Sequence, residues 1–560
     1  MNVGEMQRKL SQWAERDKDH RFFDLYHLIY DMDWLRLAHD YVKQNAGSKT
    51  AGCDGIQMSH FDERLEENLQ GLAEELRRET FEPYPVRRVL IPKANGKTRS
   101  LGIPSIRDRI VQDSLRMILE PIYEADFCQR SFGFRPNRRT MDAIKYVDLN
   151  TIGKHRYFWC IEADISSYFD TVHHRKLMQI LQGRLKDRKI LDLIWKFLRA
   201  GVMEGKLFHK TECGVPQGGI ASPLIANIYL HELDKYLEQF AGLPRSQRQR
   251  RRAKGKGNFT YARYADDVLV LCDGTKRETE DFKEELAKFL VEKLYLTLSP
   301  EKTKITHLND GIHFLGYELK RCRTSKGMNT KWLIPPAAIR RMRSKIMQAT
   351  DHHTHRDSLE CKVLGLNQII GGWCRYYQYA SGTSRPFSRI GHLLYWRMAH
   401  WLGRKYQTSI PQVMQRFECD NTFHSESNRL LMPQTDFPTK RYRQVVFKPN
   451  PYTMQEVKIE REELPDEYQW TGYEERPGMT DLRMLVIARD GYQCQICDAA
   501  VDESTAQVDH LKPVRRFKRP IDANTPDNLW TLCAKCHTEK TQFDRRMESC
   551  GAAKVACPVR

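Results

Sequence analysis

A chain of 560 residues is too long to fold around one hydrophobic core, so its length predicts roughly two to four domains. Its formal net charge of +19 is spread along most of the sequence and favours a polyanionic partner, of which nucleic acid is the commonest. A basic protein of the membrane surface is the competing interpretation. The sequence, however, has no apolar run of about 18 residues, no lipidation signal and no signal peptide, so we expect a soluble, intracellular protein with no membrane partner.

Residues 1–80 have apolar side chains at helical spacing, which predicts helices with buried faces. The stretch Val86–Thr98 is extended and contains the hairpin signal Ala94-Asn-Gly-Lys97, which predicts two strands. Lys93 and Arg99 belong to a set of cations along this hairpin. On one face these cations suit a triphosphate or a template backbone, and a solvated edge strand is an equal alternative.

Residues 107–149 are again helical in pattern, with an interruption at Ser131–Asn137. That interruption is rich in glycine, proline and aromatic residues, so we expect a loop that stacks on bases and binds phosphate. The following run, Tyr157–Ile165, predicts a short apolar strand that reaches Asp164 near its end. A carboxylate at the end of a buried strand needs a partner or a metal ion.

The segment Gly214–Pro223 is dense in glycine and proline and precedes an apolar helix, Leu224–Leu237. Its backbone N–H groups suit a nucleotide or a template base, although a tight turn into a core helix explains the same pattern. The next run, Arg245–Lys256, carries seven cations without apolar periodicity. It predicts a flexible basic loop that is able to touch RNA.

Two apolar-leaning runs with alternating and β-branched residues, Phe259–Tyr264 and Val268–Cys272, predict antiparallel strands joined by a tight turn that contains Asp266 and Asp267. Aspartate is common in turns for structural reasons alone. Adjacent carboxylates repel one another, however, and a cation relieves that repulsion. Asp164 is the natural third ligand for the pair.

Residues 334–435 contain three apolar stripes at helical spacing, which include Met342, Leu366 and Leu394 respectively, and predict a helical domain. The first stripe is set among arginine and lysine residues, so that helix is amphipathic and basic. The aromatic residues of the stripes are more typical of a core than of RNA contacts, but with the cations they favour RNA binding. After them, Lys440, Arg441, Arg443 and Lys448 predict a short basic region that contacts DNA, followed by a linker.

Fifteen cysteines are an odd count, and most are scattered singly, as expected of reduced thiols. Cys494 and Cys497 form one C-x₂-C knuckle, Cys533 and Cys536 form another, and 35 residues lie between them. This spacing is typical of a single tetrahedral structural Zn²⁺ site, and a disulfide is a poor alternative in a cytosolic chain.

The region Val86–Leu319 resembles the reverse transcriptases encoded by group II introns. The matching blocks, in order, are Ile91-Pro-Lys93 with Arg99, Ser131-Phe-Gly-Phe-Arg-Pro136, Ala163-Asp-Ile-Ser-Ser-Tyr-Phe-Asp170, Gly214-Val-Pro-Gln-Gly-Gly-Ile-Ala-Ser-Pro223, Tyr264-Ala-Asp-Asp267, Leu298-Ser-Pro-Glu-Lys-Thr303 and Phe314-Leu-Gly-Tyr317. The resemblance implies a multidomain α+β fold: a right hand with fingers and a ferredoxin-like palm, then a helical thumb or maturase domain. Asn367 and Gly372-Trp-Cys-Arg-Tyr-Tyr377 are similar to the signature of that maturase domain.

This resemblance implies that Asp164, Asp266 and Asp267, with the Ile165 carbonyl, hold two Mg²⁺ ions about 4 Å apart for phosphoryl transfer. It implies further roles for other residues, in which Phe169 rejects ribonucleotides in favour of dNTPs and Lys302 donates a proton to pyrophosphate. The expected substrate contacts are Gln217 and Gly218 at the templating base pair, with Lys93 and Arg99.

The tail around Val508-Asp-His-Leu511, Asp527-Asn-Leu529 and Cys536-His-Thr-Glu-Lys540 resembles the HNH endonucleases. The resemblance implies a ββα-metal domain, with the four-cysteine zinc site beside it. Asp509 and His537 would hold one Mg²⁺ or Mn²⁺, and His510 would deprotonate the attacking water. Asn528 would orient His510 or the phosphate, and Asn524 is a competitor for that role.

Together these features predict an N-terminal helical extension (1–79), fingers and palm (80–330), a thumb/maturase domain (331–435), a basic region and linker (436–480) and an HNH domain (481–560). The implied protein binds its group II intron RNA and target DNA, assists splicing, nicks DNA and extends the nick by reverse transcription during intron mobility. We expect it in the bacterial cytosol or nucleoid, or alternatively in an organelle.

Three rival interpretations fit less well. A splicing factor with a decayed polymerase conflicts with the intact Asp164, Asp266 and Asp267. A defence-associated reverse transcriptase fits poorly with the thumb resemblance and the HNH module. An RNA-dependent RNA polymerase is opposed by Phe169.

Overall fold

The computed structural model describes residues 2–92, 98–152, 157–204, 207–209, 213–215, 218–324, 327–443, 447–454, 459, 486–487, 490, 492–497, 499–502, 505–511 and 528–540. The chain forms two compact units. One is Met1–Trp332 with Tyr442–Glu462, and the other is Leu333–Arg441 with Glu463–Arg560.

The predicted helical start of the first unit is confirmed. Its elements are α1 (Val3–Arg16), α2 (Tyr26–Ile29), α3 (Met32–Gln44), η1 (Ala46–Lys49), α4 (Met58–Asp62) and α5 (Leu65–Arg77). Asn2 and Asp31 cap α1 and α3, since each side chain accepts a hydrogen bond from a backbone N–H of the first turn. Helices α1 and α3 pack on the long, buried helix α6 (Ile106–Glu124), so the N-terminal extension shares the main core of the unit.

The hairpin that follows also matches its prediction. Strands β1 (Val86–Pro92) and β2 (Thr98–Ile103) are antiparallel, and the turn between them lies outside the described residues. The sheet has the order β2-β1-β4-β5, in which the last two strands are β4 (Val202–Glu204) and β5 (Leu207–His209).

Helix α7 (Thr140–Thr151) precedes β3 (Trp159–Asp164), the first strand of the second sheet. Between β3 and the next strands of that sheet lie α8 (Tyr168–Thr171), α9 (His174–Leu181), α10 (Arg188–Arg199), α11 (Ser222–Ala241) and α12 (Arg245–Ala253). Helix α12 corrects the expected flexible loop. Its cations do not simply repel one another, because Arg252 pairs with the buried Asp273 carboxylate and Arg251 donates to the Gly257 carbonyl.

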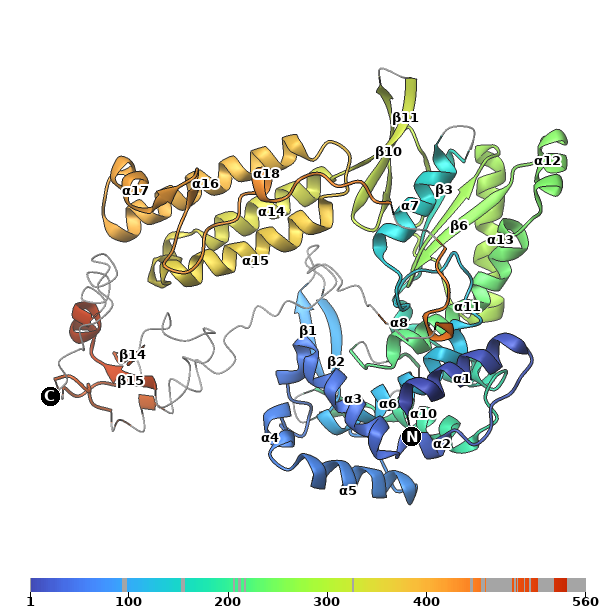
Figure 1. Cartoon of the computed structure of the whole chain (residues 1–560), viewed down its shortest axis with the longest axis horizontal. Helices are drawn as coiled ribbons and strands as arrows, with labels where there is room; N and C mark the ends of the chain where they lie inside the picture. The colour runs from blue at the N-terminus through green and yellow to red at the C-terminus, as the bar shows by residue number, and fades with distance from the viewer. Residues whose placement is uncertain are drawn as a thin grey trace. The chain divides into compact units, whose positions relative to one another are not determined.

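The second sheet positions the candidate site. Its order is β6-β7-β3-β8, with β6 (Phe259–Tyr264), β7 (Asp267–Cys272) and β8 (Lys304–His307), and each neighbouring pair is antiparallel. Helices α11 and α13 (Lys276–Leu294) lie on one side of it (Figure 1). Phe282 of α13 stacks on Phe259 of β6 and meets Phe240 of α11 edge-on, which ties both helices to the same face.

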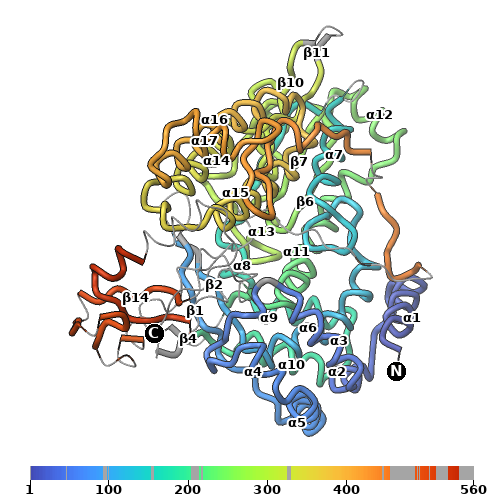
Figure 2. Tube along the Cα trace, turned by 60° about the vertical axis from the view of Figure 1, so that its left-hand side comes forward, coloured from blue at the N-terminus to red at the C-terminus, as the bar shows by residue number. Residues whose placement is uncertain are grey.

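A third sheet, in the order β11-β10-β9, follows the second, with β9 (Ile312–Phe314), β10 (Tyr317–Thr324) and β11 (Gly327–Leu333). The chain later rejoins this unit at Tyr442, whose hydroxyl donates to the fully buried Asp142. Its 3₁₀ turn η3 (Pro451–Thr453) packs against α1 (Figure 2).

One member of the predicted DNA-contacting region has a different role in the structure. The Lys448 ammonium lies 2.8 Å from the Asp142 carboxylate and donates to the Asn137 carbonyl. A buried carboxylate needs such a cation, so Lys448 holds the returning segment in place and its charge is directed inward.

The helices predicted for residues 334–435 are confirmed in the second unit. Its elements are α14 (Pro336–Ala349), η2 (His352–Arg356), α15 (Leu359–Tyr377), α16 (Ser384–Tyr406), α17 (Ile410–Phe417), β12 (Glu418–Cys419), β13 (Thr422–Phe423) and α18 (Pro433–Asp436). Met342, Leu366 and Leu394, one from each predicted stripe, are buried as expected. Asn367 serves the fold, because its amide donates to the Arg429 carbonyl and accepts from the Leu431 N–H.

The C-terminal part of this unit contains a short antiparallel pair, β14 (Gln507–His510) and β15 (Leu529–Leu532). Residues 534–540 then form a helix. Cys494, Leu532 and Cys536 make a small core against Trp530, so the cysteine residues contribute to the packing of this small domain.

Candidate functional site

The first cluster of predicted site residues lies where β6, β7 and β3 meet. Tyr264 pairs with Asp267 across the hairpin, which leaves Ala265 and Asp266 at the turn. Ala265 adopts φ +55°, a left-handed conformation that lets two residues reverse the chain. On the other side, Asp267 is the direct cross-strand partner of Asp164. Carboxylates about 100 residues apart in the sequence therefore share one end of the sheet.

Electrostatic repulsion at this end of the sheet is strong. Burial, followed by the charges of Asp266 and Asp164, raises the pKa of Asp267 to about 7. The Lys302 ammonium opposes this effect, and it lies 2.5 and 3.1 Å from the two Asp164 oxygens. That hydrogen bond raises the pKa of Lys302, so the side chain is a protonated cation at neutral pH.

The three carboxylates do not form a closed cage. Among the described residues, two groups have all their ligand atoms within 4.8 Å of one another: the four cysteines, and Asp351 with His352 and His353. The three aspartates are not such a group. Asp164 forms an ion pair with Lys302, and the Lys302 side chain is 67% exposed. A polyanionic ligand can therefore reach the ammonium group.

Three more of the predicted residues, Ile165, Phe169 and Gly218, are among the described residues. Ile165, directly after β3, is buried and forms an isolated antiparallel bridge with Leu298. The Phe169 ring is 9% exposed, and its carbonyl accepts from the Val215 N–H. Gly218 adopts φ +116°, and a Cβ there would lie 2.5 Å from the Gly102 carbonyl oxygen, so the loop meets β2 where only glycine fits.

Several predicted contacts lie beyond what the structure describes. Lys93 and Gln217 are outside the described residues, as is Asn524. Arg99 belongs to β2, opposite Ile91, and its side chain is not described.

The loop Ser131–Asn137 departs from its predicted phosphate-binding role. Arg135 is buried, binds both oxygens of Glu124 and donates to the carbonyls of Cys128 and Ser131. The guanidinium therefore donates its hydrogen bonds to groups within the protein rather than to a phosphate. The loop instead runs beside β6, where the Phe132 N–H donates to the Arg263 carbonyl.

The sequence reasoning missed Arg263 itself, together with Asn227 and Asp234 of α11. These side chains are fully or almost fully buried and bonded to one another beneath the turn. The available signal was that Asn227 and Asp234 are seven residues, or two helical turns, apart, and so lie on the same face of α11 among its buried apolar side chains.

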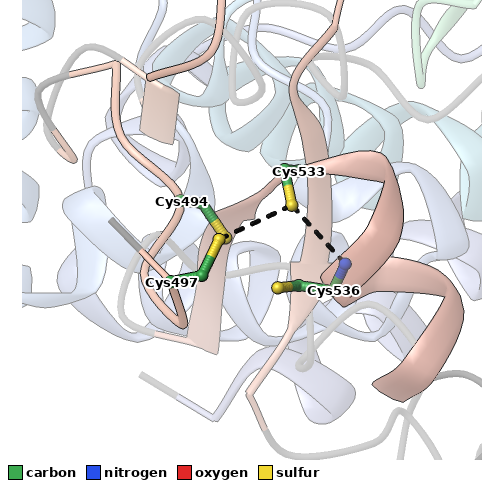
Figure 3. A group of neighbouring side chains, drawn as sticks. All are labelled: Cys494, Cys497, Cys533 and Cys536. Carbon is green, nitrogen blue, oxygen red and sulfur yellow. Dashed lines mark hydrogen bonds between the residues drawn. The ribbon is translucent and has the colours of Figure 1, made fainter. Parts of the chain in front are cut away.

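The second cluster of predicted residues is the cysteine group. The four side chains point toward one another, two from a loop before β14 and two from the start of the last described helix (Figure 3). All four sulfur atoms lie within 4.8 Å of one another, and the Cys497 and Cys533 sulfurs are 3.8 Å apart. Tetrahedral Zn²⁺ with bonds of about 2.3 Å needs sulfur atoms about 3.8 Å apart, so the donor set is compatible with a zinc site.

Asp509 and His510 end β14, and His510 pairs with Leu529 of β15. Asn528 directly precedes that strand, is 7% exposed, and accepts the Leu511 N–H through its carbonyl. These positions bring His510 and Asn528 to one end of the ribbon.

His537 lies on the helix that follows the ribbon. Burial lowers its pKa, partly offset by Asp509, so the ring is neutral at pH 7 and has an electron pair to offer a cation. Asp509 is held by Lys540 at 3.1 Å from the same helix. Asp509 and His537 therefore face a common region between ribbon and helix.

Among the described residues, no helix combines the length and the apolar composition needed to span a membrane.

Comparison with protein families matches three successive regions. Residues 91–319 match the reverse transcriptase (RNA-dependent DNA polymerase) family, residues 339–417 the group II intron maturase-specific domain, and residues 494–543 the HNH endonucleases. The class defined by this mixed α/β fold is thus a reverse transcriptase that also carries a maturase domain and a nuclease domain.

Individual relatives agree. The chain is 34% identical to the group II intron-encoded protein LtrA of Lactococcus lactis subsp. cremoris over 483 residues, which cover 73% of this chain and 79% of LtrA. It is 43% identical to protein YkfC of Escherichia coli K12 over 345 residues, 58% of this chain and 91% of YkfC. It is 28% identical to the putative COX1/OXI3 intron 2 protein of Saccharomyces cerevisiae, over 70% of this chain and 53% of that protein. The chain belongs to the group II intron-encoded proteins.

This membership confirms the predicted function and the predicted enzyme classes: the protein is multifunctional, with reverse transcriptase, maturase and HNH endonuclease domains, and intron mobility is implied by the family. The family implies intron RNA as a partner.

Proposed function

We propose that Asp164, Asp266 and Asp267, with the Ile165 carbonyl, are the residues that hold two Mg²⁺ ions for polymerisation. The observation that carries this proposal is the cross-strand pairing of Asp164 with Asp267 beside the turn that contains Asp266. These residues would hold the Mg²⁺ ions, which when bound would neutralise negative charge on the triphosphate and activate the primer hydroxyl. The raised pKa of Asp267 supports the proposal, because carboxylates crowded to this degree are relieved by cations.

The remaining polymerase residues position the substrate. The Phe169 ring excludes a 2′-hydroxyl, which selects dNTPs over ribonucleotides. Lys302 leaves Asp164 for the triphosphate and then donates a proton to the departing pyrophosphate. Gln217 and Gly218 support the templating base pair, while Lys93 and Arg99 bind phosphates.

For the nuclease, we propose that Asp509 and His537 hold one Mg²⁺ or Mn²⁺, which would polarise the scissile phosphate. His510 removes a proton from the attacking water, and Asn528 orients His510 or the phosphate. The four cysteines would hold a structural Zn²⁺ that joins the loop before β14 to the start of the helix bearing His537. The neutral His537 ring and the convergent thiols support these assignments.

The same proposal extends to the arrangement of the domains. The order β6-β7-β3-β8, with α11 and α13 on one face, is the order of a ferredoxin-like palm, which supports a right-hand polymerase with fingers and a helical thumb. The ribbon β14–β15 with its helix suits a ββα-metal domain. We assign domains to 1–79, 80–330, 331–435, 436–480 and 481–560, and place the protein in the cytosol or nucleoid with its intron RNA.

In this scheme the intron RNA splices into one strand of target DNA, the HNH site nicks the other strand, and the polymerase site extends the new 3′ end with dNTPs on the RNA template. The nick made by the HNH site would therefore supply the primer that the polymerase site extends.

The polymerase assignment is tested by primer extension on an RNA template with Asp267→Ala and, as a control, Asp310→Ala, which removes an exposed carboxylate elsewhere. The assignment predicts no extension by the first variant and normal extension by the second. Extension at the normal rate by Asp267→Ala would exclude the proposed metal site.

The nuclease assignment is tested with His510→Ala and with paired alanine variants of Asn528 and Asn524. We expect His510→Ala and Asn528→Ala to lose DNA nicking while all three variants still extend primers. Loss of nicking in Asn524→Ala alone would transfer the orienting role to that residue.

A further inference from the structure

Arg263 is an unusual residue in the palm sheet. It lies on β6, a strand that is buried throughout, and its side chain is 0% exposed. The guanidinium donates to Asp234 at 2.8 and 2.6 Å, to the Asn227 side-chain oxygen at 2.8 Å and to the Ala265 carbonyl at 3.0 Å. Its planar fork therefore connects α11 to the turn that contains Asp266.

Each partner of this ion pair favours the charged form of the other despite their burial. Burial disfavours the guanidinium cation, but Asp234 outweighs that effect, and the pKa of Arg263 is raised. Conversely, burial disfavours the Asp234 carboxylate and Arg263 outweighs it, so the pKa of Asp234 is lowered. A buried ion pair is seldom more stabilising than well-packed apolar residues, which points to a role beyond stability.

That role lies in the turn. Ala265 adopts the left-handed φ of +55° that L-residues other than glycine, asparagine and aspartate rarely take. Its carbonyl would be free to rotate at the tip of a hairpin, and Arg263 fixes it two residues away. This peptide leads directly into Asp266, and Asp267 follows as the first residue of β7.

The loop that contains Gly133 packs against the other side of this turn. A Cβ on Gly133 would lie 2.4 Å from the Ala265 nitrogen, so the loop touches the turn backbone directly. The Asn227 amide donates to the Gly133 carbonyl at 2.7 Å while its oxygen accepts from Arg263. The side-chain amide of Asn227, on α11, therefore connects the loop to Arg263, which holds the turn.

We propose that Arg263 is a positioning residue for polymerisation, which fixes the Ala265 peptide and so aims Asp266 and Asp267 at the bound cations. The inference rests on the proposed assignment of those two carboxylates as metal ligands. Arg263 touches neither substrate nor metal, and it acts through the turn together with Asn227 and Asp234.

Two variants separate positioning from folding. Arg263→Lys keeps one charge for Asp234, but it lacks the planar fork that reaches Asn227 and the Ala265 carbonyl together. The Arg263→Met/Asp234→Leu double variant removes both charges, so no unpaired charge is left in the core. The control is Arg184→Met/Asp126→Leu, because Arg184 is also buried, binds Asp126 through two donors and holds backbone carbonyls near the end of α1, away from the turn.

The readouts are kcat, the KM for primer–template and the Mg²⁺ concentration for half-maximal extension, with the thermal midpoint measured alongside. For both Arg263 variants we expect kcat to fall, in the double variant on the order of 10²-fold, as for a misplaced catalytic group. We also expect a higher Mg²⁺ requirement, an unchanged KM and intact DNA nicking. The control pair should shift the thermal midpoint without changing the Mg²⁺ requirement.

Two outcomes would overturn the proposal. One is normal kcat and Mg²⁺ requirement in the Arg263 double variant. The other is a loss that the control pair reproduces in proportion to its own thermal shift, which would make Arg263 a purely structural residue. Asp267→Ala is measured in parallel. If it also extends primers, the metal-ligand assignment has failed, and if it is inactive while the Arg263 variants are normal, only the positioning role has failed.

Discussion

The protonation of Asp267 offers a quantitative test of the polymerase site. Burial and the charges of Asp266 and Asp164 raise its pKa from 3.8 to about 7. The stability that the protonated carboxyl contributes is fully present below about pH 4 and is lost as the pH rises through about 7. A difference of about 3 pKa units corresponds to about 4 kcal/mol. This is the cost of ionising Asp267 at its site, from burial first and from the repulsion of Asp266 and Asp164 second, and a bound cation can offset it.

A cation must therefore displace a proton from Asp267 below neutral pH. Half-saturating metal concentration should rise about tenfold for each unit of pH below about 7 and change little above it. Direct binding of Mn²⁺, followed by electron paramagnetic resonance between pH 5.5 and 8.5, measures this without the pH dependence of the chemical step. An Asp509→Ala background removes a ligand of the proposed nuclease metal.

Asp267→Asn is the matched control, because it keeps the shape of the protonated side chain and cannot titrate. Its Mn²⁺ binding should be weaker and nearly independent of pH in this range. Equal pH dependence in the parent and in Asp267→Asn, or a parent affinity that is constant from pH 5.5 to 7, would refute the assignment of this carboxyl to the metal.

Three further changes have separate expected outcomes. Phe169→Val should reduce discrimination against ribonucleotides on the order of 10²-fold, seen as the ratio of kcat/KM for dNTPs and NTPs. Cys536→Ser should lower the zinc content measured by mass spectrometry and abolish nicking, with primer extension retained. Lys448→Met leaves the buried Asp142 carboxylate without its cation and should cost about 1–3 kcal/mol in urea unfolding, whereas the exposed Lys440→Met should cost little.

Local sequence signals predicted the elements of the site well. The β-branched runs around Asp266 and Asp267 predicted the hairpin, because alternation and a two-residue turn are local properties. The strand ending at Asp164 was predicted for the same reason. Their pairing is a long-range contact, and it followed from the resemblance and from the need of a buried carboxylate for a partner.

The errors have a common physical cause. The run that begins at Arg245 predicts a loop by its repulsive charge, but Asp273, far along the chain, supplies the partner that permits a helix. The loop Ser131–Asn137 was predicted to bind phosphate, but its arginine, Arg135, pairs with the buried carboxylate of Glu124. The ion-pair partner of an arginine or lysine depends on which carboxylates the fold brings near it. These contacts are long-range, so a short stretch of sequence does not predict them.

The central claim is that this chain carries two separable catalytic centres, of which one prepares the primer that the other extends. It is tested most directly with intron ribonucleoproteins that contain either Asp267→Ala or His510→Ala, on intact and on pre-nicked target DNA. We predict that Asp267→Ala nicks intact DNA without extending it, and that His510→Ala extends only the pre-nicked DNA. Failure of His510→Ala to extend the pre-nicked strand, or failure of Asp267→Ala to nick, would contradict the claim.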